Sequence, residues 1–133
     1  LDLRIFPLFT VLLLSVAPVC CTANIMLANN ICDLEHDILV KRYTLPYYIG
    51  KKASLYLYAA VYYVPYLAVI LMAALRILHP LCLVLLITLI PVQKNINIFF
   101  REQVKSRTFI TSIKNYLLII GTITALIFLS GLL

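Results

Sequence analysis

Residues 5–37 read I-F-P-L-F-T-V-L-L-L-S-V-A-P-V-C-C-T-A-N-I-M-L-A-N-N-I-C-D-L-E-H-D, an apolar run that passes directly into two asparagines and three acids. A helix of about 20 apolar residues crosses a hydrocarbon core of about 30 Å. The run is therefore long enough to span a membrane. Its acidic end should then lie at the membrane surface.

The composition of the whole chain also indicates a membrane protein. Of its 133 residues, 64% are apolar and only 12% are charged, which is more apolar surface than a soluble domain of this size can bury. The net charge is +6, but the bases are scattered between apolar runs and form no stripe or RNA-binding motif. The composition therefore argues against nucleic acid as a partner and favours an all-α, polytopic membrane protein in contact with lipid.

Hydropathy and length predict four membrane-spanning helices, and no stretch indicates a second, soluble domain. Their ranges are 5–29, 53–75, 80–100 and 109–132. The third is the least regular, because its apolar stretch stops at Val92 and polar residues begin at Gln93. We expect its end to lie in the membrane interface. In the fourth helix, Gly121 and Ala125 form a small-x-x-x-small pair, which predicts close packing against a neighbouring helix.

Basic residues cluster around two of the three connections between these spans. The first and third connections are flanked by Lys41, Arg42, Lys51, Lys52, Lys94, Arg101, Lys105 and Arg107. The opposite side has only Arg4 and Arg76. Because cytoplasmic loops carry an excess of Lys and Arg, the acidic segment after the first span is predicted to face the cytoplasm.

The acidic segment has the spacing of one helix face. A helix continued past the first span would place Asn29, Asp33 and Asp37 at i, i+4 and i+8, with Asn30 beside them. Two carboxylates on one face repel each other unless the helix end is wet or a divalent cation bridges them. Carboxylate oxygens suit Mg²⁺, which also takes substrate phosphates. Glu35 points away from this face, so it is expected to be solvated.

Further polar residues make a binding site a stronger hypothesis than a solvated helix face, which is the usual explanation of D-x-x-x-D alone. Asn29 and Asn30 lie on the inner side of the motif, where an amide needs a hydrogen-bonding partner. Lys41 and Arg42 follow the motif and can neutralise phosphate oxygens. Lys114 lies within the last span and can either extend to the interface or face a cavity near the phosphate.

The run 27–50, L-A-N-N-I-C-D-L-E-H-D-I-L-V-K-R-Y-T-L-P-Y-Y-I-G, resembles the second aspartate-rich motif of the UbiA superfamily of intramembrane prenyltransferases. It is most similar to the 1,4-dihydroxy-2-naphthoate polyprenyltransferases of menaquinone biosynthesis. In that branch N-N-x-x-D-x-x-x-D is followed by a base and by T-L-x-x-x-x-G. The run 104–118, V-K-S-R-T-F-I-T-S-I-K-N-Y-L-L, also resembles the segment that leads into the last helix of that branch.

The resemblance implies that residues 1–133 are the C-terminal part of a single prenyltransferase domain. Members have nine helices and two aspartate-rich motifs that face each other across a central cavity, whereas this chain holds only the second motif. The chain also has no methionine before Met26, so we expect further residues upstream. The resemblance implies a multi-pass protein of a bacterial cell membrane, and the fragment alone is expected to be inactive.

The resemblance also implies roles for individual residues. Asp33 and Asp37 would hold Mg²⁺ against the diphosphate of a polyprenyl donor, and Asn29 and Asn30 would help to position metal or phosphate. Lys41 and Arg42, and in one interpretation Lys114, would stabilise the departing diphosphate. The expected reaction is transfer of the polyprenyl group to an aromatic acceptor.

The acceptor and two other functions stay open. The expected acceptor is 1,4-dihydroxy-2-naphthoate, with 4-hydroxybenzoate or another ring as the alternative. A non-catalytic four-helix membrane subunit is a second hypothesis. A cation carrier is a third, and it requires the acids to lie deep in the bilayer.

Overall fold

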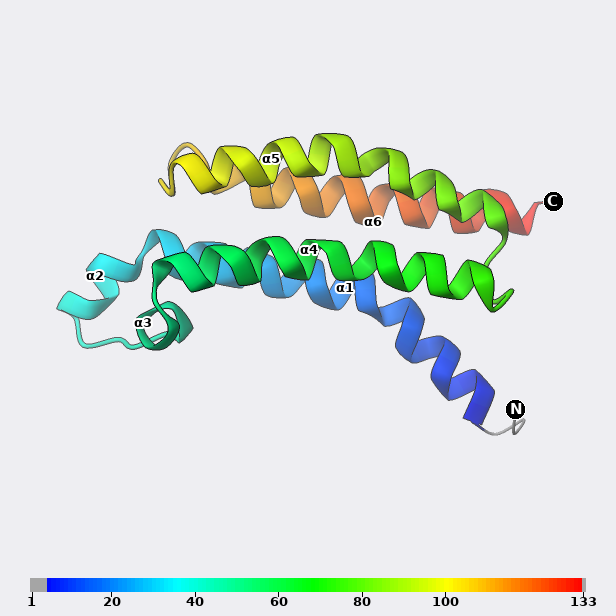
Figure 1. The fold of residues 1–133 in the computed structure, drawn as a ribbon, viewed down its shortest axis with the longest axis horizontal. Coiled ribbons are helices and arrows are strands. Elements are labelled where there is room, and N and C mark those ends of the chain that lie inside the picture. Colours follow the sequence, from blue (N-terminus) through cyan, green and yellow to red (C-terminus); the bar gives the residue numbers. More distant parts are fainter. Residues whose placement is uncertain (1–4, 133) are drawn as a thin grey trace.

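The computed structural model describes residues 5–132, and they form long helices joined by short connections (Figure 1). The long helices are α1 (Ile5–Cys32), α4 (Lys51–Ala74), α5 (Leu89–Arg101), which continues the 3₁₀ helix η1 (Pro80–Thr88), and α6 (Ile110–Gly131). Two short helices, α2 (Leu34–Leu39) and α3 (Leu45–Ile49), lie between α1 and α4. No strand occurs within residues 5–132.

Four helical segments are long and apolar enough to cross a membrane. They are Pro7–Cys32, Lys51–Ala74, Pro80–Arg101 and Ile110–Gly131. The four spans predicted from hydropathy are therefore confirmed, and the chain is an all-α, multi-pass membrane protein. The main difference in the first span is at its end, because α1 runs on to Cys32 instead of stopping at Asn29.

The third span is irregular at its beginning rather than at its end. Its first nine residues form η1, and the Nδ1 atom of His79 accepts a hydrogen bond of 3.0 Å from the Leu81 N–H at the start. A 3₁₀ helix rises about 2.0 Å per residue, against 1.5 Å in an α-helix, so this span is longer than an α-helix of equal residue count. The polar end continues as α5, with Val92, Ile96 and Phe99 buried on its inner side.

The helices pack with α1 beside α4 and α6 beside η1 and α5, and α1 also contacts α6. Buried hydrogen bonds join them in the interior. The Asn24 amide donates to the Tyr58 carbonyl at 2.9 Å, and the Tyr58 hydroxyl and Ser112 Oγ share a hydrogen bond of 2.7 Å. The Asn95 amide donates to Asn115 Oδ1 at 2.9 Å. Four helices are therefore joined by polar contacts, of which the Asn24–Tyr58 and Tyr58–Ser112 contacts are buried and the Asn95–Asn115 contact is partly buried.

Figure 1 shows that the N-terminal part of α1 bends away from the other helices. Pro18 lies inside α1, and a proline removes one helix hydrogen bond and clashes with the carbonyl four residues earlier. The bend therefore has an identifiable cause. It leaves the second half of α1 packed in the bundle, and this half leads into the acidic segment.

The predicted close packing at Gly121 and Ala125 is wrong within the described residues. Both residues are exposed, and a Cβ atom built on Gly121 would meet nothing within 4 Å. The small residues lie instead in a shallow surface groove with Leu117 and Thr122. A small-residue spacing marks a face that can be approached closely, but it does not show which face the rest of the chain uses.

The first and third connections lie at the same end of the molecule, as the basic residues predicted. Figure 1 shows α2, α3 and the α5–α6 connection at one end, and the α4–η1 connection with the beginning of α1 and the end of α6 at the other. Arg76 is in the α4–η1 connection, and Arg4 lies outside the described residues. The shared side is confirmed, whereas the cytoplasmic orientation stays a prediction.

Candidate functional site

The acidic segment begins at a break between two helices. Helix α1 ends at Cys32, and Asp33 has φ −93° and ψ 4° before α2 begins at Leu34. The backbone ladder nevertheless continues, because Asp33 N donates to the Asn29 carbonyl at 3.0 Å and Asp37 N to the Asp33 carbonyl at 2.8 Å. The expected i, i+4, i+8 relation among these three residues is therefore kept as hydrogen-bonded turns, although the helix is not continuous.

Asp37 is the buried acid of the segment. Its exposed fraction is 4%, and its Oδ2 atom is buried without a hydrogen-bond partner in the described residues. Glu35 and His36 are exposed, as expected for residues on the other side of a short helix. A buried carboxylate oxygen without a partner is costly and needs a hydrogen-bond donor or a cation.

Lys41 and Arg42 form the turn that ends α2. The Lys41 N–H donates to the Ile38 carbonyl at 3.1 Å, and the Arg42 N–H donates to the Asp37 carbonyl at 2.7 Å. This pair of bonds is a Schellman motif, in which the first residue past the cap is left-handed and is usually glycine. Lys41 occupies that position with φ 60°. Both side chains are exposed, and neither forms an ion pair within residues 5–132.

Asp33 is paired with a lysine that the sequence interpretation treated only as an orientation signal. Lys105 Nζ lies 2.8 Å from Asp33 Oδ2, and the two side chains are 54% and 25% exposed. The two residues are 72 positions apart, and Lys105 lies in the α5–α6 connection. The contact therefore joins the acidic segment to the other basic connection at the same end of the molecule.

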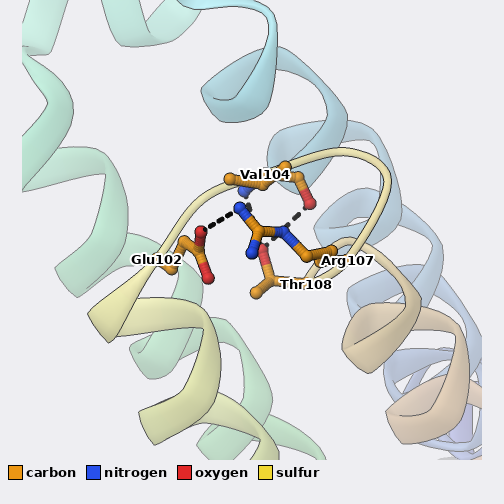
Figure 2. Close-up of polar contacts among 4 residues, drawn as sticks. All are labelled: Glu102, Val104, Arg107 and Thr108. Atoms are coloured by element: carbon orange, nitrogen blue, oxygen red, sulfur yellow. Dashed lines mark hydrogen bonds and ion pairs between the residues drawn. The ribbon is translucent and has the colours of Figure 1, made fainter.

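The α5–α6 connection is held in shape by its own polar contacts (Figure 2). The Val104 N–H donates to Thr108 Oγ1 at 2.8 Å, and the Thr108 N–H donates back to the Val104 carbonyl at 2.8 Å. Across the same loop, Arg107 Nη2 lies 2.8 Å from Glu102 Oε1. The loop that carries Lys105 is therefore a hydrogen-bonded turn and not an unstructured linker.

The remaining predicted site residues have different surroundings. Asn29 and Asn30 are half-buried at the end of α1, and their side chains form no hydrogen bond within the described residues. Lys114 is exposed on α6 and no contact joins it to the acidic segment in that part of the chain, whereas the adjacent Asn115 is fully buried and accepts from Asn95. The structure therefore brings Lys105, and not Lys114, to the motif.

The two aspartates suit a hard cation but do not complete a metal site. The orphaned, buried oxygen of Asp37 is the kind of ligand that Mg²⁺ takes, and the two asparagines offer further oxygen atoms nearby in the chain. No group of three or more His, Cys, Asp or Glu residues that could hold a metal ion occurs within residues 5–132. The residues therefore fit a magnesium–diphosphate group of which this chain would supply only part of the ligand set.

Residues 4–115 match the family model described as the UbiA prenyltransferase family. The match covers the acidic segment, both basic connections and the beginning of α6. The chain belongs to the UbiA prenyltransferase family. No curated protein and no solved structure matches the chain significantly.

Membership of the UbiA family settles the general class of activity. Members are membrane enzymes that transfer prenyl groups from prenyl diphosphates to aromatic acceptors. A purely structural membrane subunit is therefore disfavoured. A cation carrier is disfavoured by the geometry as well, because Asp33 and Asp37 follow the end of the first apolar helix and do not lie midway along it.

The sequence did not predict the role of Lys105 at this site, nor the polar contacts that hold the α5–α6 connection around it. Lys105 was visible as one base of a K-S-R run, but nothing local distinguishes it from Lys51 or Arg107. A contact across 72 residues depends on how α1 and α6 pack, which no local pattern encodes. The reciprocal Val104–Thr108 hydrogen bonds have a weak local signal, since a threonine side chain readily forms hydrogen bonds with backbone groups three or four residues away.

Proposed function

We propose that this chain is the C-terminal part of a UbiA-type domain and holds one half of its diphosphate site. In the complete protein the donor is a polyprenyl diphosphate, and the acceptor is 1,4-dihydroxy-2-naphthoate. The 133 residues alone are expected to be inactive, because the chain supplies only one aspartate-rich motif. The identity of the acceptor rests on the resemblance of residues 27–50 to that branch of the family.

The observation that carries the proposal is the buried, unpartnered Oδ2 atom of Asp37. Within the described residues it receives neither a hydrogen bond nor an ion pair. A buried anion that stays without a counter-charge destabilises a protein by several kcal/mol. Such a group is therefore expected where a cationic ligand binds and supplies the counter-charge. Glu35, two residues away, is exposed to solvent and needs no counter-charge.

Other residues of the chain would contribute to binding the same metal and diphosphate. Asp33 and Asp37 would hold Mg²⁺, with the Asn29 and Asn30 amides beside them to position metal or phosphate oxygens. Bound Mg²⁺ would neutralise charge on the diphosphate and so favour its departure. Lys41 and Arg42 are exposed and unpaired within the described residues, so their cationic groups are available to the departing diphosphate oxygens.

The reaction balances as an electrophilic aromatic substitution. The allylic C–O bond of the donor breaks, and its electron pair leaves with the diphosphate. The ring carbon that bears the carboxylate then forms a C–C bond to the allylic cation. The ring loses its carboxylate as CO₂, which restores aromaticity. This chain's contribution is to hold the diphosphate and to stabilise the negative charge that develops on it.

The proposal is tested in the complete protein reconstituted in lipid nanodiscs with Mg²⁺. Product formed from a polyprenyl diphosphate and 1,4-dihydroxy-2-naphthoate is measured by mass spectrometry. Asp37→Asn should lower turnover at least 100-fold, the scale on which loss of a group that stabilises transition-state charge acts. Glu35→Gln is the matched control, since it removes an exposed acid from the same short helix, and it should keep turnover near the wild-type value.

Two results would contradict the proposal. Wild-type turnover in Asp37→Asn would show that the buried carboxylate has no part in catalysis. A wild-type protein that prenylates 4-hydroxybenzoate and leaves 1,4-dihydroxy-2-naphthoate unchanged in a mixture of both would keep the diphosphate site but overturn the proposed acceptor.

A further inference from the structure

The two acids of the motif differ in how their charge is balanced. Asp37 is buried and its Oδ2 atom has no partner in the described residues. Asp33 is one turn earlier, and its Oδ2 atom contacts the Lys105 ammonium at 2.8 Å. One carboxylate of the proposed metal site is thus already neutralised by a cation from another part of the chain.

Polar contacts within the loop hold the Lys105 backbone where its ammonium can reach Asp33. The reciprocal Val104–Thr108 hydrogen bonds close the turn, and the Glu102–Arg107 ion pair spans it (Figure 2). The Gln103 amide donates to the Phe99 and Phe100 carbonyls at 2.7 and 2.9 Å, which ties the loop to the end of α5. Arg107 is already engaged with Glu102, so Lys105 is the loop base that reaches the motif.

The lysine side chain is also free to leave Asp33. It is 54% exposed, and an ion pair with that much exposure is weak and reversible. Lysine carries a compact charge on a flexible stem, with three donors that can be redirected without moving the backbone. Because the backbone of the loop is held in place while the Lys105 side chain can turn, the ammonium can exchange between two anionic partners.

We infer that Lys105 is a placeholder cation, which occupies Asp33 while the site is empty and moves to the diphosphate when metal-bound donor enters. This inference rests on the proposed function and adds a residue to its machinery. Before loading, Lys105 competes with the metal for Asp33. After loading, it becomes a further positive group on the diphosphate. Its removal should therefore have opposite effects on the two binding steps, which a purely structural residue would not produce.

The first measurement uses Mn²⁺ alone with the intact protein in detergent. Binding is followed by the loss of the electron paramagnetic resonance signal of free Mn²⁺. Lys105→Met should bind Mn²⁺ about two- to fivefold more tightly than wild type, which is the range that an exposed ion pair contributes. Lys94→Met removes the same charge from an exposed position of α5 that forms no ion pair within residues 5–132, and it should leave Mn²⁺ affinity unchanged.

The second measurement uses inorganic pyrophosphate at saturating Mn²⁺, followed by equilibrium dialysis. Lys105→Met should weaken pyrophosphate binding about tenfold, at the lower end for loss of one charge-assisted hydrogen bond. Lys105→Arg keeps the charge and should stay close to wild type in both measurements.

The two assays separate the inference from the function on which it rests. Unchanged or weaker Mn²⁺ binding in Lys105→Met, or unchanged pyrophosphate binding, overturns the placeholder role. If Asp33→Asn binds Mn²⁺ as tightly as wild type, the proposed metal site itself is wrong, and the placeholder role falls with it. Tighter Mn²⁺ and weaker pyrophosphate binding in Lys105→Met, with Lys94→Met unchanged, supports both.

Discussion

Lys41 allows the backbone and the charge of one residue to be tested separately. It has φ 60° at the end of α2, in the position that a Schellman motif usually gives to glycine. A left-handed conformation costs an L-residue about 1–2 kcal/mol, whereas glycine adopts it freely but loses about 0.5–1 kcal/mol more backbone entropy on folding. Lys41→Gly should therefore be more stable than Lys41→Ala by about 0.5–1 kcal/mol, the difference between these terms.

The comparison with alanine separates the effect of the φ angle from the effect of losing the charge. Both variants lose the ammonium, but only glycine relieves the strained φ angle. The Arg42 N–H, which donates to the Asp37 carbonyl at 2.7 Å, reports the stability of the turn by hydrogen exchange. Its exchange should be about two- to fivefold slower in Lys41→Gly than in Lys41→Ala, since 1.4 kcal/mol corresponds to a factor of ten. Equal or faster exchange in the glycine variant would refute the strain argument.

The same pair of variants tests the proposed role of the Lys41 side chain. If its ammonium binds the departing diphosphate, both variants should lose about 10- to 100-fold in kcat/KM, because a hydrogen bond to a charged group contributes about 1.5–3 kcal/mol. Their activities should be equal although their stabilities differ. Wild-type turnover in Lys41→Gly would show that the residue is not a diphosphate ligand.

Two further predictions concern the helix bundle, and both use a thiol-reactive dye that reports unfolding through the buried Cys21 and Cys82. Removal of the hydroxyl in Tyr58→Phe should destabilise the protein by about 1 kcal/mol, because it breaks the buried contact with Ser112; a double-mutant cycle with Ser112→Ala that shows no coupling would contradict this. Gly121→Ala should stabilise the protein by about 0.5–1 kcal/mol, since its helix face is open within the described residues. A loss of stability there would mean that another segment covers this face.

The four spans and the shared side of two connections were predictable because they depend on local properties. Hydropathy and length decide whether a stretch crosses a membrane, and every predicted boundary falls within a few residues of a helix end. The contrast between Asp37 and Glu35 was also predictable, because two positions along a helix differ by about 200° and so lie on nearly opposite sides. These features follow from helix periodicity and need no tertiary contact.

Other features depend on contacts between distant segments or on local strain. The break at Asp33 and the left-handed Lys41 leave no hydropathy signal, and aspartate and lysine give no turn signal as strong as glycine or proline. The 3₁₀ start of the third span begins at Pro80, directly after His79, but these two residues begin an α-helix equally well. The pairing of Lys105 with Asp33 required the packed arrangement of α1 and α6.

Two unfavourable features lie within a few residues of each other in the acidic segment, and their proximity supports a binding role for this segment. A buried oxygen of Asp37 has no partner in the described residues, and Lys41 holds a strained backbone four residues later. Other buried polar atoms among the described residues also have no hydrogen-bond partner, such as Asn24 Oδ1 and Tyr62 Oη, but Asp37 is the one carboxylate among them. Arg76, at the other end of the molecule, also has φ 60°. Strain of this kind persists only where the surrounding structure maintains it, and it is typical of ligand sites. A cation at Asp37 would remove the largest of these penalties, so metal and diphosphate should stabilise the whole protein as they bind.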